Sequence, residues 1–225
     1  MSKAERITTI LCAAGAAAVL GALVPGFALA APTEVTRGSF GASYTLTAAP
    51  GTTNDITVSY GVNSKGSPAY LFADSAGLTT PLFASCEGGP TGPVLTCIGP
   101  DPEDATAEED SNLKINAGDG ADSVILARGA AAIPPLVSQQ INGEDGADVL
   151  SGSEQSPGVF TSFIQGGSGN DRLFSAGSHA LGGQGGIDKL FAKNGVRNRA
   201  INCGPGKNKK ESAKRDKNDP KAVSC

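Results

Sequence analysis

The chain contains very few of the residues on which most enzymes depend. Its 225 residues include no tryptophan, one methionine and one histidine, and aromatic residues make up only 5%. The single histidine, His179, lies in a Gly/Ser turn, where we expect it to be exposed and inert. The sequence has no H-E-x-x-H pair, no G-x-S-x-G turn and no Walker loop. These absences give no support to a metalloprotease, a serine hydrolase or a P-loop enzyme, and we expect no catalytic function.

Helical periodicity is also missing after residue 30, because no stretch there keeps apolar residues at i, i+3 and i+4 over a helical length. Glycine is abundant, with 31 residues, and short alternating segments lie between Gly/Asn/Pro clusters. The strands that we predict in the first half are 43–47, 55–60, 69–72, 94–97 and 113–115. The composition therefore predicts an all-β, turn-rich fold.

Residues 1–30 have the pattern of a secretory signal peptide. Lys3 and Arg6 precede an apolar, Ala-rich stretch that ends in the cleavage pattern of residues 28–30. A membrane anchor is the alternative, but Pro25 and the small residues near the end favour cleavage. We expect a secreted, extracellular protein with no membrane span after cleavage, either released or held at the cell surface.

Four cysteines follow the signal peptide. Cys86 and Cys97 bracket a Gly/Pro-rich loop, whereas Cys203 and Cys225 bracket a basic tail. An even number of cysteines in an exported protein indicates disulfides, and proximity favours the pairs 86–97 and 203–225 over the crossed pairings. Zinc is not expected, because zinc sites use more closely spaced cysteine pairs.

A Gly–Asp pattern occurs four times, at residues 118–124, 143–150, 165–174 and 183–190. In each copy glycines precede an aspartate, and an apolar residue follows two positions later. Glycines permit tight turns with inward carbonyls, and the later apolar side chain faces inward on a short strand. Carbonyl and carboxylate oxygens together suit a hard cation, above all Ca²⁺.

The four aspartates are spaced as stacked turns require. Asp122, Asp148, Asp171 and Asp188 are separated by 26, 23 and 17 residues, whereas a turn built from two nonapeptides takes about 18. The longer intervals fit with insertions at 129–135 and 151–158 on the opposite side. We therefore predict one column of aspartate loops. In the alternative interpretation the glycines serve turn geometry alone and the aspartates cap turns by hydrogen bonding, without metal.

Residues 166–174 match the nonapeptide GGxGxDxUx of the hemolysin-type (RTX) calcium-binding repeats. The other copies resemble it less closely, since Ala117, Glu144 and Gln184 replace glycines. The resemblance implies a parallel β-helix or β-roll solenoid that holds Ca²⁺ between adjacent turns. The metal-site residues that it indicates are Asp119, Asp122, Gly143, Asp145, Asp148, Gly166, Ser168, Asn170, Asp171, Gly183 and Asp188.

The flanking regions resemble exported RTX-like proteins of actinobacteria. Residues 31–112 are similar to their N-terminal part, so we expect opening turns of the solenoid or a small β cap. The motif CGPG at 203–206, followed by Cys225, resembles their terminal cap. That cap usually carries aspartates, whereas this chain has Asn198, Asn202, Asn208 and Lys210, which should weaken or abolish calcium binding there. The predicted divisions are 1–30, 31–112, 113–191 and 192–225.

Charge divides the chain into an acidic body and a basic tail. From residue 189 onward Lys and Arg outnumber Asp and Glu by 11 to 3, whereas the preceding residues have 7 against 19. The tail is either a solvated, disulfide-pinned cap or a surface for an anionic cell-wall polymer. Nucleic acid is not expected, because the tail lacks aromatic residues that stack on bases. The acidic segment 101–110 is expected to be a solvated loop.

The sequence thus predicts an exported, non-catalytic, calcium-binding β-solenoid. Its alternatives are a metal-independent surface or adhesion module and, from paired carboxylates on the loops, a carbohydrate-active β-helix enzyme. The predicted inward-facing residues are Leu113, Ile115, Val124, Leu126, Ile141, Leu150, Phe160, Phe163, Leu173, Leu181, Leu190 and Phe191.

Overall fold

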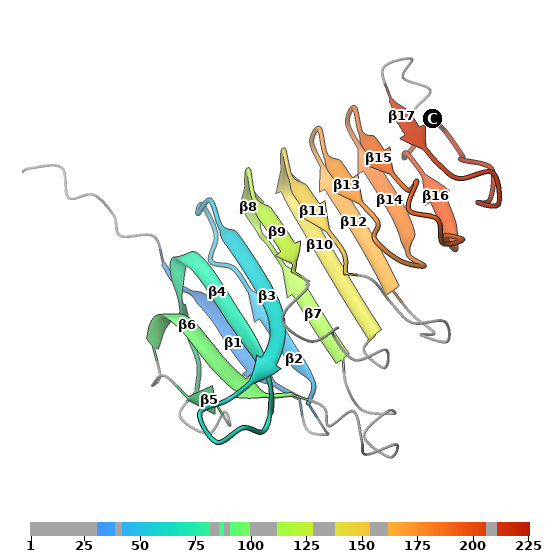
Figure 1. Ribbon diagram of the computed structural model, residues 1–225. Helices are drawn as coiled ribbons and strands as arrows, with labels where there is room; N and C mark the ends of the chain where they lie inside the picture. The colour runs from blue at the N-terminus through green and yellow to red at the C-terminus, as the bar shows by residue number, and fades with distance from the viewer. Residues whose placement is uncertain are drawn as a thin grey trace, which may run out of the picture.

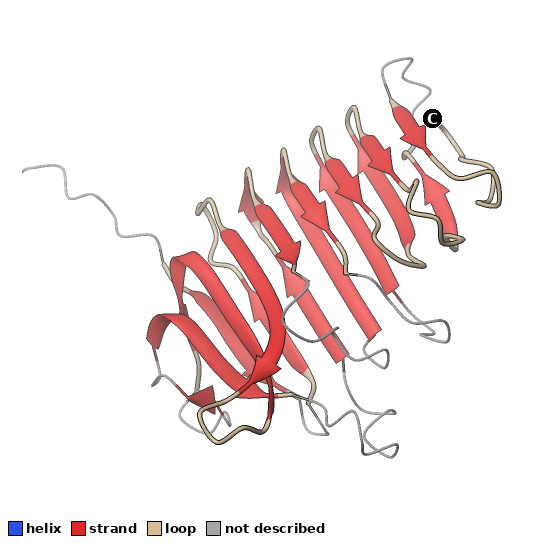
Figure 2. Ribbon diagram, viewed as in Figure 1, coloured by secondary structure: helices blue, strands red, loops and turns tan. Residues whose placement is uncertain are grey.

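The computed structural model describes residues 31–38, 42–81, 86–87, 91–99, 112–127, 138–153, 162–205 and 211–225. The predictions for 1–30, 101–110 and Phe160 lie outside these residues, as do those for Asn208 and Lys210. Throughout the described ranges every regular element is a strand, as Figure 2 shows. Those ranges also contain no helix long and apolar enough to cross a membrane.

Two parallel stacks of strands form the body of the molecule (Figure 1). The first stack contains, in order, β2 (Tyr44–Thr47), β7 (Asn112–Asn116), β10 (Ser138–Gly146), β12 (Ser162–Ser168), β14 (Ala180–Gly185) and β16 (Ala200–Asn202). The second contains β3 (Asp55–Val62), β9 (Ser123–Leu126), β11 (Val149–Ser151), β13 (Arg172–Phe174), β15 (Lys189–Phe191) and β17 (Ser212–Lys214). A Gly–Asp loop links the two stacks within each of four successive turns. The short strand β8 (Asp119–Gly120) lies within the first of these loops and pairs with the end of β10. The predicted β-solenoid is confirmed.

The N-terminal region supplies both an opening turn and a cap. β2 and β3 pair in parallel with β7 and β9, so they are the first turn of the solenoid. The remaining strands of this region are β1 (Thr33–Arg37), β4 (Pro68–Thr79), β5 (Cys86–Glu87) and β6 (Thr91–Ile98). They add antiparallel pairs over the end of the stack, as Figure 1 shows. The cap covers the end of the stack at β2 and β3, where unpaired strand edges would otherwise invite association.

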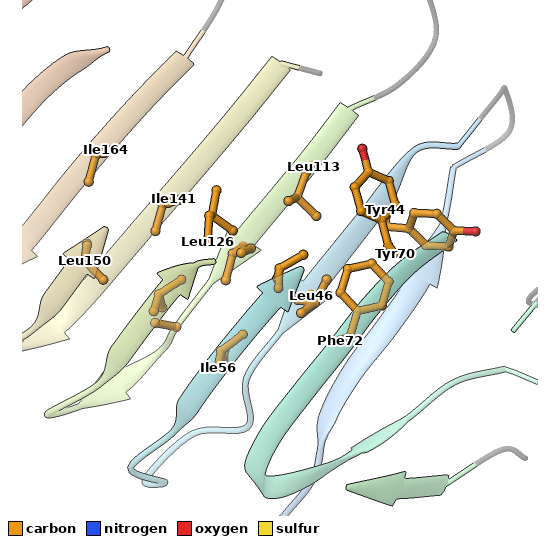
Figure 3. Close-up of a cluster of buried hydrophobic side chains, with 14 of the residues drawn as sticks. Tyr44, Leu46, Ile56, Tyr70, Phe72, Leu113, Leu126, Ile141, Leu150 and Ile164 are labelled. Carbon is orange, nitrogen blue, oxygen red and sulfur yellow. The ribbon is translucent and has the colours of Figure 1, made fainter. Parts of the chain in front are cut away.

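Strand alternation places an apolar column inside each stack. In the first stack the register aligns Leu46, Ile115, Ile141, Ile164, Leu181 and Ile201. In the second it aligns Ile56, Val124, Leu150, Leu173 and Leu190. All of these side chains are at most 2% exposed, and burial of each contributes about 1.5 to 3 kcal/mol. Figure 3 shows the columns ending at the packed rings of Tyr44, Tyr70 and Phe72.

Two predicted inward residues face outward. Phe163 is 38% exposed, and Ile164 next to it is buried in its place. Phe191 is half-buried, because its neighbour Leu190 occupies the inward position of β15. Successive strand residues point to opposite faces, so where two apolar residues are adjacent an error of one residue reverses the assignment. The other predicted inward residues within the described ranges are buried.

Both predicted disulfides are present. Cys86–Cys97 joins β5 to β6 in the cap. Cys203–Cys225 ties the chain terminus to the end of β16, where Asn202 and Val223 form a parallel bridge. The C-terminal tail therefore lies against the last turn, and the bonds are compatible with an extracellular protein.

Candidate metal centre

The four repeat aspartates form one continuous column along the solenoid. The Oδ1 atom of each later aspartate accepts a hydrogen bond from the backbone N–H of the aspartate one turn earlier. The N–H of Asp122 donates to Asp148, that of Asp148 to Asp171, and that of Asp171 to Asp188, each at 2.9 Å. The side chains are 0 to 1% exposed. The spacing of 26, 23 and 17 residues thus does bring the aspartates into register.

The second oxygen of each aspartate has no partner. Within the described chain, Oδ2 of all four residues is buried and makes no hydrogen bond. An ionised carboxylate has about four acceptor sites, and leaving buried ones unsatisfied is costly. The column therefore contains a row of buried carboxylate oxygens that have no hydrogen-bond partner among the described residues.

Three glycines leave the space in which these oxygens lie. A Cβ atom added to Gly143, Gly166 or Gly183 would collide with Oδ2 of the aspartate in its own turn. It would also meet a backbone carbonyl of the next turn, which belongs to Gly166, Gly183 and Cys203 respectively. Each Oδ2 atom thus lies close to a carbonyl oxygen of the neighbouring turn, and only glycine leaves room for both.

The turn that contains Asp122 differs in this respect. Ala117 is in register with Gly143, because Asn116 pairs with Asn142 and the Ala117 N–H donates to the Asn142 carbonyl. A real Cβ therefore stands where the other turns have a glycine, so the Asp122 turn lacks this space. The replacements at Glu144 and Gln184 have another consequence, since both adopt left-handed φ values of 73° and 70°. These residues keep the loop shape at some conformational cost.

Burial and neighbouring carboxylates raise the pKa of all four repeat aspartates. Desolvation is the largest cause, and it raises the pKa of Asp148 and of Asp171 from 3.8 to about 6. Neighbouring carboxylates raise both further, whereas the backbone hydrogen bonds lower them. The pKa values of Asp122 and Asp188 are raised for the same first reason. At neutral pH the aspartates are therefore ionised, and their ionisation lowers the stability of the folded state.

The donor set fits a hard cation if backbone oxygens supply most of the ligands. Among the described residues no three His, Cys, Asp or Glu side chains cluster as a metal site. Each gap between turns instead offers an unpartnered carboxylate oxygen beside a carbonyl of the next turn. Ca²⁺ accepts mixed carboxylate and carbonyl oxygens in flexible geometry, whereas zinc prefers nitrogen and sulfur. Asp148, Asp171 and Asp188 with the facing carbonyls would hold such an ion.

The remaining predicted ligands lie in a separate row at the exposed loop tips. Asp119, Asp145 and Ser168 are aligned by strand pairing, and all three are exposed. Asp119 Oδ1 accepts the N–H of Gly51 at 2.6 Å, and Asn170 Oδ1 accepts that of Ile187 at 2.8 Å. The side chains of Asp119 and Asn170 thus join one turn to the next. The predicted metal-site residues therefore divide into a buried column and an exposed row at the loop tips.

The column is longer than the repeat motif predicts. Asn54 precedes Asp122 in register, and its backbone N–H donates to Asp122 Oδ1 at 2.8 Å. At the other end Glu211 follows Asp188, is 8% exposed and has a buried Oε2 atom without a partner. Neither residue follows a Gly–Asp loop, so only strand register identifies them. A carboxylate therefore continues the column into the tail.

His179 is buried, contrary to the prediction of an exposed histidine. It is 0% exposed, its Nδ1 lies 2.9 Å from Ser175 Oγ, and burial lowers its pKa to about 4. Its backbone N–H donates to Asn198 Oδ1 at 3.4 Å, and the Asn198 N–H in turn donates to Asp219 Oδ1 at 2.8 Å. A second polar ladder thus stabilises the opposite side of the last turns.

No protein-family model, curated protein or solved structure matches the chain.

Proposed function

We propose that this protein is an exported, non-catalytic β-solenoid that binds Ca²⁺ between its stacked turns. The observation that carries the proposal is the row of buried, unpartnered carboxylate oxygens facing backbone carbonyls of the next turn. Residues 166–174 also resemble the RTX calcium-binding nonapeptide. With side chains at most 1% exposed, the four column carboxylates have no access to a glycosidic bond, so they could not be the catalytic pair of a carbohydrate-active enzyme.

In this proposal metal binding and folding are coupled. Without calcium the ionised carboxylates of adjacent turns repel one another in a desolvated column. A cation between two turns neutralises that charge and joins the turns through their oxygens, so its binding energy adds to folding stability. Glycines at 143, 166 and 183 keep the space open, whereas Ala117 closes it in the turn that contains Asp122.

Calorimetric titration of the disulfide-intact mature chain with calcium tests this function. Asp148→Asn and Asp171→Asn together should abolish or strongly weaken calcium binding while keeping the Oδ1 acceptors of the ladder. Asp145→Asn is the matched control, because this exposed loop-tip carboxylate lies outside the column. The proposal fails if wild type takes up no calcium at millimolar concentration, or if the control loses as much affinity as the column variant.

The second candidate is a metal-independent surface or adhesion module. The Oδ1 ladder favours it, because the aspartates tie turns together by hydrogen bonds even without metal. This candidate predicts that the chain folds equally well in chelator and that its function resides on its outer faces.

A further inference from the structure

The outer face of the second stack near its C-terminal end combines cations with a pair of aromatic rings. Strand register places Arg172 beside Lys189 in one outward row, and Phe174, Phe191 and Lys214 in the next. The three cations are exposed and the two rings are half-buried. These five residues, which we call the β13–β17 face, lie side by side only because turns 17 and 23 residues long stack in register.

Two of the three cations of the β13–β17 face, Arg172 and Lys214, lie over the rings. Phe174 and Phe191 stack with centroids 4.5 Å apart and planes 5° apart. The Arg172 guanidinium lies 5.7 Å from the Phe174 centroid, and the Lys214 ammonium lies 5.6 Å from that of Phe191. Cation–π attraction thus places these charges and reduces the entropy lost when they bind a ligand.

More positive charge continues beyond β17. A hollow of about 530 Å³ is lined by Lys193, Lys214, Arg215 and Lys217 together with Asp216. The single acid is already engaged, because Asp216 Oδ2 accepts the N–H groups of Asn194 and Gly195. Within the described residues the structure records no carboxylate paired with any of the lysines. The face and the hollow share Lys214 and therefore form one strip in which cations outnumber carboxylates.

We propose that this strip binds an acidic polysaccharide carrying uronate carboxylates. Neighbouring strands lie about 4.8 Å apart, so cations on successive strands meet a linear polymer at regular intervals. The exposed parts of the ring pair, together with Val149 and Ile125 at 36% and 41% exposure, add an apolar strip for the carbon skeleton of the sugars. Nucleic acid fits less well, because each ring has one face against the other ring and has Arg172 or Lys214 over it, which leaves no open ring face for a base.

The site is distinct from the aspartate column, which lies inside the solenoid. The test therefore uses the full mature chain in millimolar calcium, so that the fold is kept whether or not calcium is needed. Hyaluronate, a uronate polymer, is the probe, with dextran as the neutral polymer and an oligothymidylate as the nucleic acid. Binding is measured by calorimetry or affinity electrophoresis at about 50 and 200 mM salt.

Lys189→Gln with Lys214→Gln should weaken hyaluronate binding about tenfold and flatten its salt dependence. The charge-matched control is Lys65→Gln with Lys114→Gln, which lie in the cap and on the other stack, and it should change affinity less than twofold. Melting curves confirm that both variants are folded. Four results would overturn the proposal: no binding of hyaluronate, equal binding of dextran, equal losses in the two variants, or tighter binding of oligothymidylate.

Discussion

Replacing Asp171 by asparagine should change stability in opposite directions with and without calcium. The amide oxygen can still accept the Asp148 N–H, but the buried negative charge is removed. Burial raises the Asp171 pKa from 3.8 to about 6, and a shift of this size means that ionisation costs about 3 kcal/mol. This cost already includes the hydrogen bond from the Asp148 N–H, so nothing further is subtracted for it. In chelator at neutral pH, Asp171→Asn should therefore be more stable than wild type by about 3 kcal/mol.

Calcium should reverse this order. Free calcium at a thousandfold excess over the dissociation constant stabilises a one-site protein by about 4 kcal/mol. A variant that loses this one site gains about 4 kcal/mol less from calcium than the wild type does, so it should then be less stable than wild type by about 1 kcal/mol. For a chain of this size each kcal/mol shifts the melting temperature by about 2 to 4 °C.

Differential scanning calorimetry of both proteins in EGTA and in calcium measures this crossing. An Asp171→Asn variant that is less stable than wild type in EGTA would show that the buried carboxylate carries no penalty. An unchanged response to calcium in the variant would show that Asp171 binds no ion. Either result would refute the reasoning.

Three further predictions follow from the same column. Asp171→Ala should lose more calcium affinity than Asp122→Ala in a titration, because Asp171 has a repeat aspartate on both sides; equal losses would count against the stacked column. Gly183→Ala should lower the melting temperature, whereas Gly182→Ala should not, since only at Gly183 does a Cβ collide with its surroundings; similar melts would contradict this. In chelator, lowering the pH from 7 to 5 should stabilise the wild type by about 2 kcal/mol more than the Asp148→Asn, Asp171→Asn double variant, as measured by urea denaturation. The sign is set by Asp148 and Asp171, whose raised pKa values make the folded state bind protons more tightly. The opposing effect of buried His179, whose pKa is lowered to about 4, is common to both proteins; an equal pH response of the two proteins would contradict the prediction.

The sequence predicts the solenoid because its two determinants are local. The position of each aspartate relative to its glycines, and of each apolar residue relative to the aspartate, specifies a loop followed by a strand. The intervals between Asp122, Asp148, Asp171 and Asp188 then specify the stacking. The disulfide pairing can likewise be predicted from the sequence, because the two cysteines of each pair lie close together along the chain.

Other features depend on register between distant segments, which no local pattern contains. Asn54 and Glu211 join the column only because β3 and β17 pair with β9 and β15. Phe163 points outward because Ile164 takes the inward position of β12, and the sequence alone does not tell which of these two adjacent apolar residues faces the core. The burial of His179 requires that its short loop stacks on the loop of Asn198. The β13–β17 face likewise appears only once three turns are aligned.

The central claim is that calcium binding to the aspartate column is coupled to folding of the solenoid. The most direct test is circular dichroism with thermal melting of disulfide-intact residues 31–225, in excess EGTA, in millimolar magnesium and in millimolar calcium. We predict that calcium, unlike magnesium, increases the β signal or raises the melting temperature by many degrees. The same spectrum and the same melting temperature in all three buffers would contradict the claim, and the aspartates would then be structural turn residues.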